Sequence, residues 1–396
     1  MMMLAVVFAN ADAKRVSDDC QVEIIAPGQS KFHPNSVIAC VWGHDSEWTV
    51  TWSQDGKDMG LMTMVQDCSP ACIKKIGEFY AKKGKDIHYF AATPDQYAKV
   101  VTVNVRSRSG KEWKFDVKLS DYVDVQAHRG GAGLWPENTF TSMTKATEIG
   151  VNTLELDLQI SQDGKVVVSH DAYFNSRYAT RPDGSEVKSE DPKEYLYTMP
   201  YSTIAKYDVG KRPSPEWPGK EQSPAIKPLA SELIDSVENY VKANGLDPMR
   251  YNIEIKCRKG KDEGKNWPEY HEFVDKCMEL LLSKDLGDRL VIQCFDVRAL
   301  NYMHEKYPQV KLSYLIRKMD TDWNTYMGRL NFTPDWLSPE FVIVDQTMVD
   351  NCRKAGIRLV PWTVDNEADI RRILDFHVEA IITNYPDRVL KITRGY

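Results

Sequence analysis

The sequence predicts an α/β fold: a TIM-type (β/α)8 barrel preceded by a small all-β sandwich domain. At 396 residues the chain is long enough for two domains, or for one large barrel with an appendage. Residues 20–120 contain short strand-like runs, whereas from residue 121 strands alternate with helices over about 270 residues. A doubly wound sheet is the alternative, but no glycine-rich phosphate fingerprint opens its first helix.

The composition is that of an ordinary soluble globular protein, with 42% hydrophobic and 27% charged residues. The formal net charge of −6 argues against a nucleic-acid partner, because binding to phosphate backbones needs clustered lysine and arginine. No window holds the roughly 18 consecutive apolar residues of a membrane span. We therefore expect no integral membrane segment.

The N-terminal stretch 1–13 is apolar and ends in Ala11-Asp12-Ala13. This ending resembles the cleavage site of a secretory signal peptide, although no basic residue precedes the short apolar run. We expect an exported protein, periplasmic or secreted, with residues 1–13 as the remnant of a signal. A frayed apolar N-terminus on a cytoplasmic protein is the alternative.

The eight cysteines fall into two groups on either side of residue 121. In an exported protein the first group could form disulfides, whereas the second group lies in apolar segments typical of buried thiols. The first group is Cys20, Cys40, Cys68 and Cys72, and the second is Cys257, Cys277, Cys294 and Cys352.

The N-terminal part predicts an all-β sandwich with one helix-like interruption at Ile73–Lys83. Its strongest hairpin signal is the Asp55-Gly56 turn. This part loosely resembles the C-terminal sandwich domain of secreted calcineurin-like phosphoesterases, but it lacks that family's metal motifs, so that activity is not implied. We expect a spacer or docking module whose partner is unknown. The predicted strands are Val22–Ala26, Val37–Trp42, Trp48–Trp52, His88–Ala92, Val100–Val105 and Glu112–Leu119.

From residue 121 the chain predicts alternating strands and helices, interrupted by a long polar segment at 171–228. A loop of that length is usually functional or an inserted subdomain. The predicted strands are Val123–Ala127, Thr153–Ile160, Val166–Ser169, Tyr251–Lys256, Arg289–Phe295, Lys311–Ile316, Phe341–Val344, Arg358–Val364 and Ala380–Asn384. The predicted helices are 139–149, Ser231–Asn244, Tyr270–Leu282, Val297–Lys306, Thr347–Ala355 and Glu367–Phe376.

Acidic residues recur at the strand ends, where barrels carry their catalytic groups. Glu155 and Asp157 are spaced i and i+2, which places both on one face of a strand. Glu254 ends another strand. A pair of acids usually marks a solvated strand face, but inward carboxylates in a barrel need compensation. Three hard oxygen ligands favour one divalent cation, Mg²⁺ or Ca²⁺.

A turn at Asp163-Gly164 adds a geometric prediction. If these two residues form a two-residue hairpin turn, Gln162 pairs with Lys165. Counting back along both strands then places Asp157 directly opposite His170, on the same face. The turn would bring this histidine to the carboxylates.

Two histidines and two cations complete the predicted site. His128 and His170 both flank the acidic pair, and imidazole can accept or donate a proton near neutral pH. Arg129 and Lys256 are cations that could hold a phosphoryl oxygen. Each of these residues alone is more often a surface or packing residue.

The motifs His128-Arg129-Gly130, Glu155-x-Asp157 and Glu254-x-Lys256 together resemble the glycerophosphodiester phosphodiesterase family, over about residues 121–392. The remaining motifs are Pro136-Glu137-Asn138-Thr139, His170-Asp171, Pro361-Trp362-Thr363-Val364 and Thr383-Asn384-Tyr385-Pro386-Asp387.

The resemblance implies a TIM-type fold and hydrolysis of small glycerophosphodiesters to glycerol 3-phosphate and an alcohol. It makes Glu155, Asp157 and Glu254 the metal ligands. His128 and His170 become the acid/base pair, with Arg129 and Lys256 as phosphate ligands.

Two other functions stay open from the sequence. One is a phospholipase-C-like or phospholipase-D-like enzyme that acts on intact lipids, against which the missing membrane-binding helix weighs. The other is a non-catalytic phosphate- or glycan-binding protein that uses the sandwich, against which the complete set of catalytic residue types argues. The tyrosine-rich segment 171–228 either covers the pocket and selects the headgroup or simply packs over the barrel rim.

Overall fold

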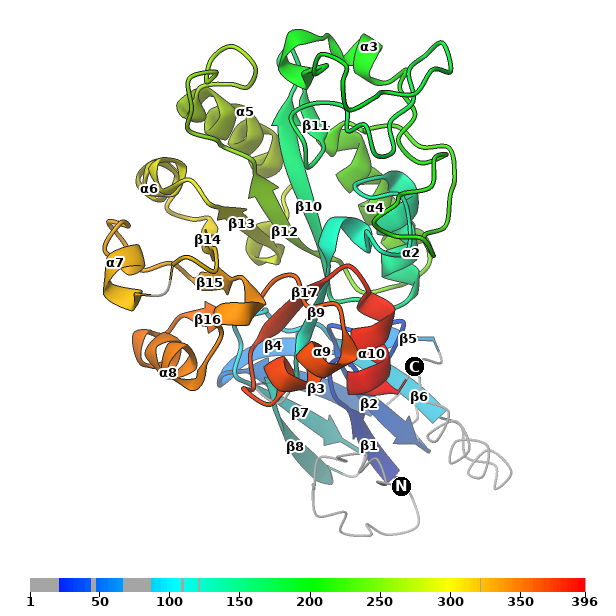
Figure 1. Cartoon of the computed structure of the whole chain (residues 1–396). Helices are drawn as coiled ribbons and strands as arrows, with labels where there is room; N and C mark the ends of the chain where they lie inside the picture. The colour runs from blue at the N-terminus through cyan, green and yellow to red at the C-terminus, as the bar shows by residue number, and fades with distance from the viewer. Residues whose placement is uncertain are drawn as a thin grey trace. The chain divides into compact units, whose positions relative to one another are not determined.

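The computed structural model describes residues 21–43, 48–66, 87–107, 110–119, 122–320 and 322–395. They form two compact units, one of Met1–Tyr122 with Lys242–Asp247 and one of Val123–Val241 with Pro248–Tyr396 (Figure 1). The signal-like stretch 1–13 and the helix-like stretch Ile73–Lys83 lie outside the described residues. Cys20, Cys68 and Cys72 also lie outside them, so the expected disulfides stay a prediction.

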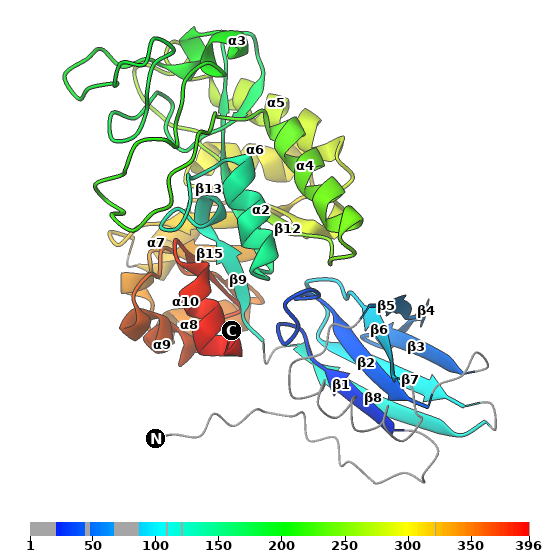
Figure 2. The ribbon, with the colours of Figure 1, turned by 90° about the vertical axis from the view of Figure 1, so that its right-hand side faces the viewer.

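The first unit contains two four-stranded antiparallel sheets (Figure 2). Side chains from both sheets share one apolar core that includes Val41, Val50 and Val103, which is the packing of a β-sandwich. The predicted all-β sandwich is therefore confirmed. The first sheet has the order β1 (Gln21–Ile25), β2 (Val37–Trp42), β6 (Ile87–Ala92), β5 (Thr63–Val65). The second has the order β4 (Lys57–Leu61), β3 (Thr49–Gln54), β7 (Val100–Arg106), β8 (Glu112–Lys118).

The predicted hairpin turn joins β3 to β4. Gln54 pairs with Lys57 across it. Asp55 and Gly56 have φ angles of +47° and +82°. Positive φ at both central residues is the requirement of a type I′ turn, which matches the twist of the flanking strands.

The second unit is a parallel barrel whose strands are ordered as they occur in the chain, with the last strand beside the first. Between the seventh and eighth strands the ring is closed by backbone bonds, in which Ile382 donates to Pro361 and accepts from Val364, each at 3.0 Å. The predicted barrel is thus confirmed. Its parallel strands are β9 (Asp124–Ala127), β10 (Thr153–Ile160), β12 (Arg250–Ile255), β13 (Leu290–Cys294), β14 (Lys311–Ile316), β15 (Trp336–Pro339), β16 (Arg358–Leu359) and β17 (Ala380–Thr383).

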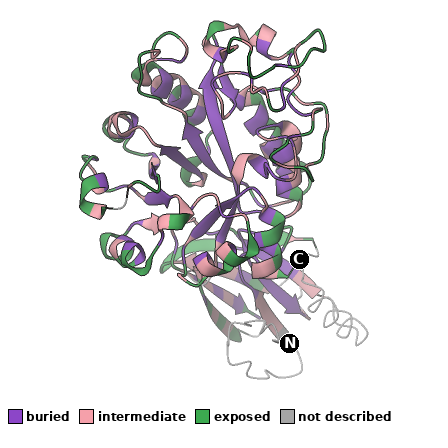
Figure 3. Cartoon of the chain, in the orientation of Figure 1, coloured by how far each residue is buried: buried purple, intermediate pink, exposed green. Residues whose placement is uncertain are grey.

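Helices surround this ring, and the strands between them are buried on both faces (Figure 3). Leu154, Leu156 and Leu158 of β10 are fully buried on the face opposite its carboxylates. Strands covered on both faces are expected in a parallel barrel, because each crossover packs a helix on the outside. The helices are α2 (Phe140–Glu148), α4 (Ala230–Ala243), α5 (Tyr270–Leu282), α6 (Val297–Lys306), α7 (Trp323–Met327), α8 (Gln346–Ala355), α9 (Glu367–Leu374) and α10 (Pro386–Arg394).

The sixth barrel strand differs from the prediction. The expected strand at Phe341–Val344 is instead the 3-10 turn η5, Phe341–Ile343, and Val342 is 51% exposed. The strand is β15, which is wholly buried and pairs with β14 and β16. A proline within a segment argues against a strand, because proline has no backbone N–H to donate. Pro339 is the last residue of β15, where the absence of this N–H removes no hydrogen bond of the strand. Helices α7 and α10 were also not predicted.

A long connection, residues 169–229, separates the short strand β11 (Val166–Val168) from α4 and contains η3 (Leu196–Thr198) and α3 (Tyr201–Ile204). It has its own apolar cluster, in which the rings of Phe174 and Tyr207 stack at 3.8 Å. The segment is therefore a small folded insertion.

The cysteines of the barrel unit are free thiols. Cys277, Cys294 and Cys352 are buried free thiols as predicted, whereas Cys257 is half-buried. Within the described ranges, no helix combines the length and apolar character needed to traverse a lipid bilayer.

Candidate active site

Three carboxylates from two neighbouring strands meet at the mouth of the barrel. β10 and β12 run parallel, with Asp157 beside Glu254 in the register, and Glu155 lies two residues earlier on the same face of β10. One carboxylate oxygen from each residue lies within 4.8 Å of those of the other two, and all three side chains are buried. Buried like charges at this separation repel strongly, so the arrangement needs nearby cations.

Burial and the neighbouring charges shift the pKa values of the three acids in different directions. Burial and the neighbouring Asp157 charge raise the pKa of Glu155 well above its ordinary value. Burial also raises the pKa of Glu254, although Lys256 opposes it. Burial alone would raise the pKa of Asp157 too, but Lys256, His170 and Arg129 lower it.

The three carboxylates are suitable ligands for a divalent cation. No donor of the described residues forms a hydrogen bond to the buried Oδ1 of Asp157, although Lys256 Nζ lies 3.4 Å away. Oxygen ligands of this kind suit Mg²⁺ or Ca²⁺. The residues that could hold the ion are therefore Glu155, Asp157 and Glu254, as the sequence predicts.

The two predicted cations lie directly against these acids. Lys256 Nζ is 2.8 Å from Glu254 Oε1. Arg129 donates its backbone N–H to Glu155 Oε2 at 2.7 Å, and its Nε lies 3.5 Å from Asp157 Oδ2. The φ angle of Arg129 is +52°, a conformation that is strained for a residue other than glycine.

His128 follows β9 and is oriented by the last strand. Its Nδ1 lies 2.6 Å from Asn384 Oδ1, and Asn384 Nδ2 donates to Asp365 Oδ2 at 2.8 Å. Because the Asp365 carboxylate only accepts, the amide oxygen of Asn384 faces the histidine, and His128 Nδ1 must carry a hydrogen. Burial and the Arg129 charge lower the pKa of His128 to about 3. The ring is therefore neutral at pH 7, with Nε2 as its acceptor.

His170 has a different partner. Its Nδ1 lies 3.1 Å from Asp171 Oδ1, and Asn175 Nδ2 donates to Asp171 Oδ2 at 2.7 Å. Burial alone would raise the pKa of Asp171, but the hydrogen bond and charge of His170 lower it. The Asp171 carboxylate accepts from Nδ1 and so orients the ring of His170 and fixes which nitrogen carries the hydrogen.

The predicted pairing of Asp157 with His170 is wrong by one residue. The register pairs Leu158 with Val168, and Ser169 N–H donates to Asp157 O at 2.8 Å. Of the two turn residues only Gly164 has a positive φ, +73°, so the loop has three residues rather than two. His170 follows the end of β11, and its charge still acts on Asp157.

Polar residues deeper in the barrel support Glu155. Gln293 Nε2 donates to Glu155 Oε1 at 2.8 Å. Asn252 Nδ2 in turn donates to Gln126 Oε1 at 2.8 Å and to Gln293 Oε1 at 3.3 Å. Each comes from a strand position on the inner face, so the sequence alternation of β9, β12 and β13 was the signal that could have identified them.

Several residues around the site were not assigned roles from the sequence. Glu137 accepts from Arg129 Nη1 at 2.9 Å. Asn138 Nδ2 donates to Asp157 Oδ2 at 2.8 Å. From the insertion, buried Lys227 donates to Ser169 Oγ at 2.7 Å. Glu137 and Asn138 belong to the motif Pro136-Glu137-Asn138-Thr139, which was the signal for them, but nothing in the sequence around Lys227 indicates its position.

Comparisons with known proteins agree with this geometry. The sequence model of the glycerophosphoryl diester phosphodiesterase family matches residues 128–388. A glycerophosphodiester phosphodiesterase of Bacillus subtilis is 26% identical over 284 residues, which cover 70% of this chain and 88% of the relative. Another, of Caldanaerobacter subterraneus, is 25% identical over 271 residues, which cover 68% of this chain and 97% of the relative.

Solved structures share the barrel. A crystal structure of a Silicibacter pomeroyi protein has a TM-score of 0.61 at 23% identity, covers 68% of this chain and 93% of its own, and shows the fold. An Oleispira antarctica phosphodiesterase, solved with the product sn-glycerol-3-phosphate, has a TM-score of 0.53 at 25% identity over 67% of this chain and 94% of its own. Because the family match spans more than half of the 396 residues and includes the carboxylate cluster and both histidines, this chain belongs to the glycerophosphoryl diester phosphodiesterase family.

Proposed function

We propose that this chain hydrolyses glycerophosphodiesters to glycerol 3-phosphate and an alcohol, with one divalent cation held by Glu155, Asp157 and Glu254. The observation that carries the proposal is the grouping of these three buried carboxylates within 4.8 Å, with Lys256 Nζ 2.8 Å from Glu254. Family membership and the product bound to the Oleispira antarctica relative support the substrate class.

The chain's own cations would bind the phosphate group of the substrate. When bound, Mg²⁺ or Ca²⁺ supplies positive charge to a phosphoryl oxygen. Lys256 Nζ lies 3.4 Å from Asp157 Oδ1, and Arg129 Nε lies 3.5 Å from Asp157 Oδ2. They can therefore contact the phosphoryl oxygens of a diester placed over the carboxylates, and Arg129 is held in place by Glu137.

The two histidines would divide the proton transfers. His128 presents a neutral Nε2, which can accept a proton from the nucleophile. His170, hydrogen-bonded to the Asp171 carboxylate, can carry the proton that the leaving alkoxide needs. The nucleophile is either the neighbouring glycerol hydroxyl, which gives a cyclic product first, or water.

A single assay tests the proposal. The purified full-length protein is incubated with glycerophosphocholine, and glycerol 3-phosphate is measured by a coupled enzyme. We expect production that stops with a chelator and returns with Ca²⁺ or Mg²⁺. Absence of hydrolysis with either ion, or hydrolysis that the chelator leaves unchanged, would contradict the proposal. Glu254→Gln should lose the metal-dependent activity because it removes one carboxylate charge from the cluster.

A second substrate class is favoured by one relative. Human lysophospholipase D GDPD1 is 27% identical over 277 residues, which cover 66% of this chain and 83% of the relative. This similarity supports a lysophospholipid as an alternative substrate. Comparing kcat/KM for glycerophosphocholine and lysophosphatidylcholine decides between them, because only an enzyme with room for the acyl chain turns over the second.

A further inference from the structure

A cavity of about 350 Å³ opens beside the carboxylate cluster. It begins at Glu254 and Lys256, which belong to the proposed catalytic site, and extends over the ends of β12, β13 and β14. Its volume is in the range of small-molecule pockets and exceeds the space of one phosphate group. Residues that line it include Lys256, Arg258, Lys259, Phe295, Asp296 and Arg317, which we call the basic pocket.

Three of these cations have no carboxylate partner in the described part of the chain. Arg258, Lys259 and Arg317 form no ion pair with any of the residues that the structure describes. All three side chains are solvent-exposed. By contrast, Arg329 pairs with Asp320 at 2.8 Å. The basic pocket therefore has an uncompensated positive charge.

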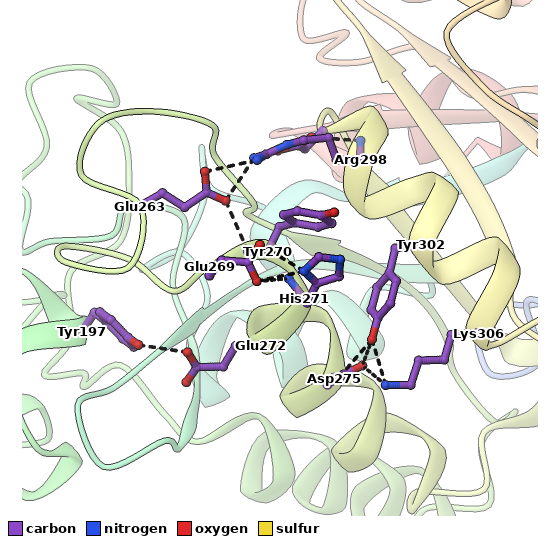
Figure 4. A network of polar contacts seen from close by, with 11 residues as sticks. Tyr197, Glu263, Glu269, Tyr270, His271, Glu272, Asp275, Arg298, Tyr302 and Lys306 are labelled. Carbon is purple, nitrogen blue, oxygen red and sulfur yellow. Dashed lines mark hydrogen bonds and ion pairs between the residues drawn. The ribbon is translucent and has the colours of Figure 1, made fainter.

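The acids nearest to the pocket are already neutralised. Asp296 pairs with Arg298 at 2.6 Å. Arg298 also pairs with Glu263 at 3.1 Å (Figure 4), and its guanidinium therefore contacts both acids. The carboxylate of Glu254 forms an ion pair with Lys256. The acids of this region consequently do not compensate the three unpaired cations.

Aromatic rings hold two of the cations in place. The guanidinium of Arg317 lies 4.3 Å from the centroid of Phe295, whose ring meets Trp362 edge-on at 5.5 Å. The guanidinium of Arg258 lies 5.5 Å from the centroid of Trp267. Stacked guanidinium groups keep their N–H donors free for a planar or tetrahedral anion. A quaternary ammonium group would need these ring faces and would be repelled by the cations that occupy them.

We propose that the basic pocket binds a second phosphate group, carried by the alcohol part of the substrate. The proposal rests on the proposed function, because it takes the reacting phosphodiester to lie at the carboxylates, at the inner end of the pocket. The enzyme would then prefer diesters whose alcohol bears a phosphate over diesters of neutral or cationic alcohols. Arginine and lysine together suit a terminal phosphate, which offers several acceptor oxygens.

The test uses two substrates that differ by one phosphate, glycerophosphoinositol and glycerophosphoinositol 4-phosphate, with the full-length protein and saturating metal. We expect kcat/KM to be roughly tenfold higher for the phosphorylated substrate, as two to three exposed ion pairs allow. The preference should shrink as the salt concentration rises, because the cations are exposed.

Variants identify the pocket as the source of the preference. The double variant Lys259→Gln, Arg317→Gln should lower the ratio of the two kcat/KM values toward one. Lys318→Gln is the matched control, since Lys318 is exposed, follows Arg317 directly and does not line the cavity. Equal kcat/KM values in the unchanged enzyme, or equal losses on both substrates in the double variant, would overturn the proposal.

A binding measurement separates this proposal from the proposed function. Calorimetric titration of the metal-free full-length protein with each compound needs no turnover. Tighter binding of the phosphorylated compound, lost in the double variant, supports the basic pocket even if neither compound is hydrolysed. Equal binding of both compounds rejects the pocket even if both are hydrolysed.

Discussion

The two histidines of the site differ in the atom that faces Nδ1. His128 meets the amide oxygen of Asn384, whereas His170 meets the carboxylate of Asp171. An amide oxygen that accepts from Nδ1 fixes the tautomer of the ring. A carboxylate that accepts from Nδ1 fixes the tautomer and also adds a negative charge beside the ring. Two side chains of the same kind therefore have environments suited to opposite proton transfers.

We expect His128→Ala and His170→Ala each to lower kcat by at least about 100-fold, the usual size of an acid/base contribution. His304→Ala, an exposed histidine of α6, serves as the control and should leave kcat unchanged. Turnover of glycerophosphocholine measures the effect. Near-normal turnover in either of the first two variants would remove that histidine from the mechanism.

The pKa of His128 also predicts a pH dependence of stability. The pKa is about 3 in the folded chain and about 6.5 in the unfolded chain, so only the unfolded chain binds the proton between these values. The stability from the neutral ring is thus present above pH 6.5 and is lost as the pH falls toward 3, at up to about 1.4 kcal/mol per pH unit. In thermal unfolding from pH 7 to pH 4, His128→Asn should lose less stability than the parent. Parallel losses would contradict the low pKa.

At the scale of elements, two Asp-Gly pairs show what the sequence can and cannot predict. Asp55-Gly56 forms the two-residue turn that the dipeptide favours. Asp163-Gly164 does not, because Ser161 accepts from the Lys165 and Gly164 backbone N–H groups and closes a three-residue loop instead. The dipeptide predicts a hairpin in both cases, but the choice between loop lengths depends on neighbouring side chains.

The carboxylates of the site could be predicted from the sequence, whereas the residues that hold the histidines in place could not. The i and i+2 spacing of Glu155 and Asp157 fixed their shared face, because strand periodicity is local. Lys227 reaches Ser169 across 58 residues of chain, and His128 reaches Asn384 across 256. Contacts at such separations depend on how the barrel closes and how the insertion folds, which local patterns do not encode.

Lys227 ties the insertion to the strand end that bears His170. Its ammonium donates to Ser169 Oγ, and Ser169 Oγ donates to Asp171 O at 2.7 Å. Burial lowers the pKa of Lys227, with the charges of Asp171 and Glu137 opposing that shift. Removing the ammonium should loosen this segment and lower kcat.

We expect Lys227→Met to reduce kcat about tenfold, equivalent to one lost buried hydrogen bond. KM should change less than kcat, because the residue positions His170 rather than the substrate. Lys206→Met, an exposed lysine of the same insertion, is the control. A change confined to thermal stability, with kcat intact, would make the contact structural only.

At the scale of the whole molecule, all three carboxylates belong to the barrel unit. A ligand that binds only the folded state stabilises it by about 2.7 kcal/mol at one hundred times its Kd. Scanning calorimetry of the full chain should therefore show that Ca²⁺ or Mg²⁺ raises the barrel transition and leaves the sandwich transition in place. Glu254→Gln should weaken the shift. A shift of the sandwich transition alone would place the ion elsewhere.

The closure of the barrel links the first strand to the last. β9 pairs with β17, and Asn384, directly after β17, orients His128 across 256 residues of chain. A ribosome adds about 5–20 residues per second, so His128 emerges on the order of tens of seconds before its partner is made. The acids and the histidine therefore exist in the growing polypeptide before the histidine has its tautomer fixed. The chain therefore acquires a base of fixed tautomer only after Asn384 has been synthesised and β17 has paired with β9.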